Sequence, residues 1–146
     1  MFDLTTSIAV NAPVDHAFAV LWDVERYPEF LTDVVDVVED PQPKPNERIV
    51  HYTVRAPRLL HYSLHMIATP PHGIAWTLLA SDLQRENHGG WQVMATPEGS
   101  LLTVRLQMEF RLPVPEVILK KLVEFNLPVM MRQMRARIEH AYRTAG

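Results

Sequence analysis

Apolar and polar residues alternate along most of the chain, which is the pattern of strands that bury one face. In the longest stretch, 102–112, every second residue is Leu, Val, Met or Phe, and polar or charged residues lie between them. Shorter stretches of the same kind lie at 4–10, 34–40, 50–56, 60–68, 74–78 and 89–93. Because short connections join successive strands, the sequence predicts a seven-stranded antiparallel sheet, with a polar loop at 81–88.

Other segments have the spacing of helices. After Pro13, apolar residues recur at 14, 18, 21 and 22, which predicts a short helix, and a second short helix is predicted over 24–30. A long amphipathic helix is predicted over 116–142. Pro128 lies inside it and lacks the N–H that would bond the carbonyl of Glu124, so we expect a kink there. This weak point is a candidate gate for a space under the helix.

The twelve prolines lie mostly at the ends of these segments, and no long linker separates two domains. We therefore predict a single α+β domain over residues 1–146. A curved sheet must cover its concave face, and only the long C-terminal helix is large enough to do so. A sheet that grips one kinked helix in this way leaves room for a pocket between them.

Composition excludes several classes of protein. With 47% hydrophobic and 21% charged residues the chain is not intrinsically disordered, and without cysteine it has no disulfides, thiolate metal sites or cysteine nucleophile. The longest apolar run, 17–22, is too short to span a membrane, and no secretion signal follows Met1, so a cytoplasmic location is expected. The net charge of −3 argues against nucleic-acid binding.

No catalytic constellation is evident. His51, His61 and His65 have the parity of the convex face; His61 and His65 are too far apart along their strand to share a metal, and no carboxylate is expected between them and His51. The serines lack a nucleophile-elbow context, and Gly89-Gly90 lacks the rest of a phosphate loop. We predict no catalytic residue, no metal site and no cofactor.

The alternate strand positions that face the concave side of the sheet instead carry aromatic and thioether side chains, which suit an adaptable apolar pocket. The predicted ligand-binding residues are Tyr52, Tyr62, Met66, Trp76, Trp91, Met108 and Phe110 on strands and Leu122, Asn126 and Met130 on the long helix. The alternative for each of them is to pack a closed core, which is the commoner role of such residues. The amide of Asn126 needs partners, which are either the polar end of a ligand or a carbonyl freed by the kink. The same parity sends Arg55, Arg105, Glu109 and Arg111 to the convex face.

Several local motifs occur in a characteristic order. A first strand leads through Ala12-Pro13 into a helix, Tyr27-Pro28-Glu29-Phe30 follows, and Gly90-Trp91-Gln92-Val93 and Pro113-Val114-Pro115 precede the long helix. In this order and spacing, the chain resembles the START / birch-pollen-allergen-like (SRPBCC) superfamily. More narrowly, it resembles the polyketide cyclase/dehydrase and coenzyme Q-binding START branch. The resemblance implies a helix-grip fold with a hydrophobic cavity.

Three functions follow as hypotheses. The first is binding of a lipid-, polyketide- or quinone-like small molecule between sheet and helix. The second is a polyketide cyclase or dehydratase in which Tyr52, Tyr62 or Asn126 polarises a carbonyl. The third is a ribosome- or protein-binding module, since some relatives resemble ribosome-association toxins and the helix ends in the basic Arg132, Arg135 and Arg137. A homodimer is left open.

Overall fold

The computed structural model describes residues 1–41, 44–55 and 58–145, and its centre is the expected seven-stranded sheet. The elements in chain order are β1 (Phe2–Val10), α1 (Val14–Trp22), the 3-10 helix η1 (Val24–Glu29), β2 (Val34–Glu39), β3 (Glu47–Val54), β4 (Leu60–Thr69), β5 (Gly73–Ser81), β6 (Gln84–Thr96), β7 (Gly99–Phe110) and α2 (Glu116–Thr144). The strand order is β1-β7-β6-β5-β4-β3-β2, with antiparallel neighbours. Residue 56, predicted to end the third strand, lies outside the described residues.

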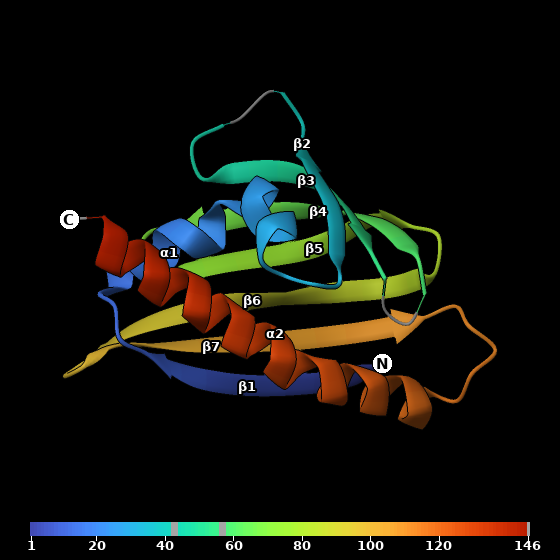
Figure 1. Cartoon of the computed structure of the whole chain (residues 1–146). Coiled ribbons are helices and arrows are strands. Elements are labelled where there is room, and N and C mark those ends of the chain that lie inside the picture. Colours follow the sequence, from blue (N-terminus) through green and yellow to red (C-terminus); the bar gives the residue numbers. More distant parts are fainter. Residues whose placement is uncertain (42–43, 56–57, 146) are drawn as a thin grey trace.

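The period-two pattern determines which side of the sheet is buried. On β7, Leu102 and Val104 are almost completely buried, whereas Arg105 next to them is exposed. Helix α2 lies across the concave face, with α1 beside its C-terminal end and η1 next to β2 (Figure 1). The helix-grip α+β fold predicted from the sequence is therefore confirmed.

The predicted loop over 81–88 is wrong. Strand β5 continues to Ser81 and β6 begins at Gln84, so only a two-residue turn separates them. The side chains of Gln84 and Asn87 are 2% and 4% exposed and are hydrogen-bonded to each other. Because these buried positions carry amides instead of apolar groups, and because the register shifts between Gln84 and Glu86, no alternating pattern is visible in the sequence.

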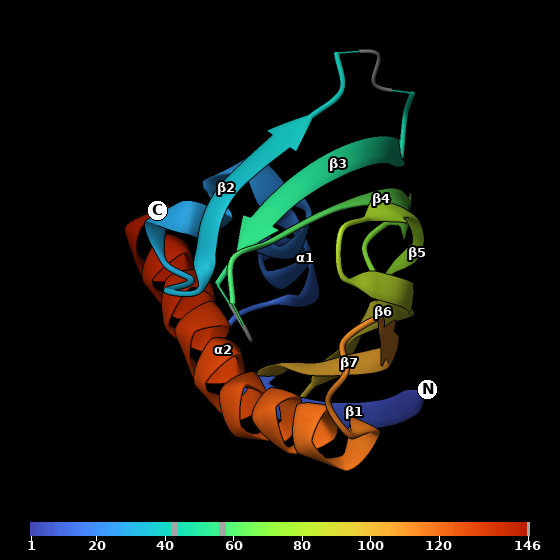
Figure 2. The same cartoon turned by 90° about the vertical axis from the view of Figure 1, so that its right-hand side faces the viewer.

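Helix α2 runs unbroken past Pro128 and bends as it wraps around the sheet (Figure 2). Its buried side chains are concentrated after residue 126, where Met134 and Ile138 are fully buried and α2 contacts α1. Its first turns carry large apolar side chains that face solvent, Phe125 most of all. No helix within the described residues is long and apolar enough to cross a membrane.

Candidate functional site

A cavity of about 270 Å³ lies between the concave face of the sheet and helix α2. All ten residues that the sequence predicted as ligand-binding line it: Tyr52, Tyr62, Met66, Trp76, Trp91, Met108 and Phe110 from strands, and Leu122, Asn126 and Met130 from α2. The lining also includes residues that the prediction missed, among them Tyr27, Leu31, Asp33 and Asn87. The first three come from η1 and the turn after it, where strand parity does not apply.

Two tyrosines form one wall of the cavity. Tyr52 on β3 and Tyr62 on β4 are register partners, and their rings stack with centroids 5.1 Å apart. The hydroxyl of Tyr52 donates a hydrogen bond to the sulfur of Met66 at 3.0 Å. Within the described part of the chain, the hydroxyl of Tyr62 has no hydrogen-bond partner. Burial raises the pKa of both phenols, so both keep the proton that they can donate.

A second wall contains a chain of buried polar groups. The indole N–H of Trp76 donates to the Asn87 side-chain oxygen at 3.1 Å, and the Asn87 amide donates in turn to Gln84 at 3.1 Å. Gly89 pairs with Trp76 across β5 and β6, and a Cβ there would clash with the carbonyl of Arg105 and touch the indole ring. The glycine therefore allows the close approach of the Arg105 carbonyl and leaves room for the Trp76 ring, whose indole N–H is satisfied by Asn87.

The family assignment rests on a match that spans most of the chain. The profile of a family described as "Polyketide cyclase / dehydrase and lipid transport" matches residues 10–135. The chain belongs to this family. Among curated proteins, none matches the chain in sequence.

Solved structures with the same fold extend the comparison. The Zhui aromatase/cyclase from Streptomyces sp. R1128 superimposes with a TM-score of 0.87 at 18% identity, covering 99% of this chain and 98% of its own. A START superfamily protein from Mycobacterium smegmatis gives 0.85 at 18% identity, covering 94% of this chain and 97% of its own. A protein from Thermus thermophilus gives 0.81 at 14% identity, covering 99% of both chains. At these identities the likeness establishes the fold, in agreement with the resemblance drawn from the sequence motifs.

In this member of the polyketide cyclase/dehydrase family, Asn126 lies on the cavity side of α2 two residues before Pro128. The sequence left two roles for its amide. Within the described residues, no hydrogen bond joins that amide to a helix carbonyl or to any other protein group. Its position on the cavity lining agrees with the other role, in which it faces a ligand.

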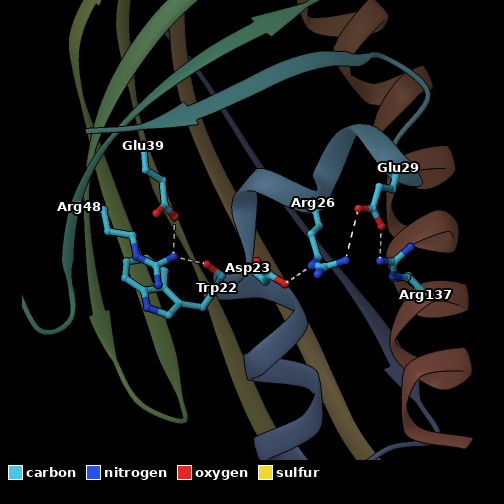
Figure 3. Close-up of polar contacts among 7 residues, drawn as sticks. All are labelled: Trp22, Asp23, Arg26, Glu29, Glu39, Arg48 and Arg137. Atoms are coloured by element: carbon cyan, nitrogen blue, oxygen red, sulfur yellow. Dashed lines mark hydrogen bonds and ion pairs between the residues drawn. The ribbon is translucent and has the colours of Figure 1, made fainter. Parts of the chain in front are cut away.

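Polar contacts hold the α1–η1 corner, residues 14–29, against the sheet and α2 (Figure 3). A guanidinium N–H of Arg48 on β3 donates to the backbone carbonyl of Trp22 and, at 2.9 Å, to Glu39, while the guanidinium lies 3.9 Å from the centre of the Trp22 ring. On the other side, Arg137 of α2 donates to Glu29 at 2.6 Å. These contacts fix the segment that carries Tyr27 to the cavity.

The histidines of β3 and β4 lie on the convex face, as predicted, and two of them have a carboxylate neighbour that the sequence analysis did not anticipate. Asp40 lies 2.7 Å from His51, and Glu47 lies 2.7 Å from His65. The pairing of β2 with β3 brings Asp40 to His51, which residue spacing alone does not show. In the described residues, no group of three or more candidate ligands is placed to hold a metal ion.

The basic end of α2 was the basis of the partner-binding hypothesis. Arg137 is engaged within the protein, because it pairs with Glu29 and stacks on Phe30 with its guanidinium 4.9 Å from the ring centre. This leaves Arg132 and Arg135 without an ion pair among the described residues.

Proposed function

We propose that this chain binds a hydrophobic small molecule in the cavity between its sheet and helix α2. The observation that carries the proposal is the cavity itself, about 270 Å³ in volume and lined by aromatic, aliphatic and thioether side chains. Small-molecule sites typically measure about 300–1,000 Å³, so this one suits a compact ligand such as a fused-ring molecule or a short chain. The family description, which includes lipid transport, supports the same proposal.

The cavity lining offers two uncharged polar side-chain groups that no other protein group uses within the described chain. These are the hydroxyl of Tyr62 and the amide of Asn126. In an apolar cavity a few such groups orient the polar end of a ligand, and the apolar walls provide most of the affinity. We therefore expect a ligand that is mainly apolar and carries one hydrogen-bonding end.

The proposal is tested by filling the cavity. Met108 lines the cavity from β7, whereas Met94 on β6 is 58% exposed on the convex side. Met108→Trp is expected to weaken binding of the uncharged reporter N-phenylnaphthylamine by at least about tenfold, since indole and reporter compete for one space. Met94→Trp, the matched control, is expected to bind like the wild type. Circular dichroism verifies that both variants are folded.

Mass spectrometry of molecules extracted from the natively purified protein gives an independent reading. An apolar molecule that co-purifies with the wild type and is depleted in Met108→Trp would identify the ligand. If Met108→Trp and Met94→Trp bind the reporter equally well, the cavity is not the binding site and the proposal is wrong.

An aromatase/cyclase activity is the second candidate, favoured by the protonated phenols in the cavity and by the family description. Tyr52 or Tyr62 would donate a hydrogen bond to a carbonyl as negative charge develops on its oxygen, and Asn126 would help to orient the chain. The test is cyclisation of a poly-β-ketone thioester by Tyr52→Phe/Tyr62→Phe. Removal of such donors costs about 10²–10³ in turnover. Unchanged turnover with intact reporter binding would contradict this role for the tyrosines.

A further inference from the structure

The lining of the cavity carries negative charge and no balancing positive charge among the described residues. Among the described residues that line it, Asp33 is the one charged side chain, and none of them is Lys or Arg. Asp33 lies in the turn between η1 and β2 and is exposed, so it occupies the rim and not the interior. An exposed aspartate is negatively charged at neutral pH.

This carboxylate forms no ion pair with a basic side chain within 4 Å among the described residues. Where β2 pairs with β3, the basic residue Arg55 follows β3, and its backbone N–H donates to the Asp33 carbonyl oxygen at 2.9 Å. Arg55 itself is exposed and does not line the cavity. The negative charge of Asp33 therefore attracts or repels the charged group of a ligand at this rim, which we call the mouth of the cavity.

A ligand with a carboxylate is disfavoured in both orientations. With its carboxylate inside, the charge leaves water for a cavity that has no cation to pair with it, which is strongly unfavourable. With its carboxylate at the mouth, the charge stays hydrated but lies near Asp33, which repels it. A hydroxyl or carbonyl can bond Tyr62 or Asn126 inside without either penalty, and an amine at the mouth is attracted to Asp33.

We infer that the cavity selects its ligand by charge: it favours an apolar molecule whose polar end is uncharged or basic over the corresponding carboxylic acid. Free fatty acids and other apolar carboxylates are therefore expected to bind more weakly than the matching alcohols and amines. This inference rests on the proposed ligand-binding function and narrows its substrate class.

The test compares three compounds that share one apolar body, namely naphthalene bearing an aminomethyl, a hydroxymethyl or a carboxylate group. The affinity of each compound is measured by its displacement of N-phenylnaphthylamine from the wild-type protein at low ionic strength and pH 7. The expected order of affinity is amine, then alcohol, then carboxylate. Because Asp33 is exposed and screened by water, we expect the amine and carboxylate to differ from the alcohol by about two- to fivefold at the mouth, and less in high salt.

The variant Asp33→Asn assigns the effect to one side chain. It should weaken amine binding and strengthen carboxylate binding by about the same two- to fivefold, with the alcohol unchanged. The matched control is Asp36→Asn, three residues further along on β2, exposed and outside the cavity lining. That variant should keep the wild-type order.

The outcomes separate the two claims. If none of the three compounds displaces the reporter, and the reporter itself does not bind, the proposed function fails and this inference fails with it. If all three bind but the carboxylate binds as well as the alcohol, ligand binding stands and charge selection is refuted. If Asp33→Asn and Asp36→Asn behave alike, Asp33 does not set the selection and the inference is equally refuted.

Discussion

Arg48 is the residue whose replacement most directly tests how the α1–η1 corner is held. Its guanidinium donates to the Trp22 carbonyl and to Glu39, and the side chains of Arg48 and Glu39 are only 24% and 23% exposed. A hydrogen bond to a charged group contributes about 1.5–3 kcal/mol and the contact with the Trp22 ring about 0.5–1 kcal/mol. Since these terms overlap, we expect Arg48→Met to lower the free energy of unfolding by about 2–4 kcal/mol.

The loss should depend on pH in a defined direction. Burial raises the pKa of Glu39 in the folded protein, and the neighbouring Arg48 lowers it, so removal of Arg48 raises it further. When the pKa of a carboxyl is higher in the folded than in the unfolded state, the free energy of unfolding falls as the pH rises through the folded pKa. The loss of unfolding free energy caused by Arg48→Met should therefore be smallest near about pH 4 and should reach its full size by about pH 7.

Urea denaturation followed by circular dichroism at several pH values measures this deficit. The matched control is Arg105→Met, because Arg105 pairs with Asp3 at 2.7 Å but the two side chains are 58% and 45% exposed. Such an exposed pair is screened by water and contributes little to stability. Adding Glu39→Gln to Arg48→Met should restore part of the loss by removing the unpaired charge. If Arg48→Met costs no more than Arg105→Met at pH 7, the reasoning is wrong.

Two further predictions concern the walls of the cavity. Asn87→Leu leaves the Trp76 N–H without its acceptor and should lower the free energy of unfolding by about 1–3 kcal/mol in thermal or urea denaturation. The control Gln92→Leu, on the convex face, should be nearly neutral. Equal effects of the two variants would contradict the role of the buried hydrogen-bonded chain. Pro128→Ala should stabilise the protein by about 1–3 kcal/mol and slow reporter release in stopped-flow measurements, because a helix interior disfavours proline. Equal hydrogen-exchange protection of residues 117–126 and 131–140 in the wild type would exclude the gate at Pro128.

The fold could be predicted because its main signals are local. The alternation around Leu102 and Val104 shows which face of β7 is buried, and Pro13 and Pro115 immediately precede the two α-helices. The prediction failed at Gln84 and Asn87, where burial depends on hydrogen bonds between two amides and not on apolar character. A pattern of hydrophobicity cannot reveal such a strand, because each amide is acceptable in the interior only once its partner is in place.

The cavity lining could be predicted for the strands and α2 but not for the turns. The parity of the strands places Tyr62 and Met108 on the concave face, where both line the cavity. Tyr27 and Asp33 lie on a 3-10 helix and in a turn, whose side-chain directions follow no simple period, and their distance from α2 depends on how the α1–η1 corner packs. The same is true of Asp40 beside His51, which depends on the pairing of β2 with β3.

The two halves of helix α2 are held very differently, and this difference bears on how a ligand reaches the cavity. In the C-terminal half, Met134 and Ile138 are fully buried, and Glu139 accepts a hydrogen bond from the Asn11 backbone at 2.9 Å. Between residues 116 and 126, all of which the structure describes, Leu119 is the one buried side chain, and Phe125 is 76% exposed.

The free energy of local opening depends on the buried contacts that must be broken. It is therefore lower for the N-terminal half of α2, which nonetheless contributes Leu119, Leu122 and Asn126 to the cavity lining. Pro128 marks the boundary, since it removes the one backbone hydrogen bond that would couple its turn to the carbonyl of Glu124. Displacement of residues 116–126 would uncover the cavity and leave the packing around Met134 intact. We therefore expect ligand exchange to occur under this half of the helix.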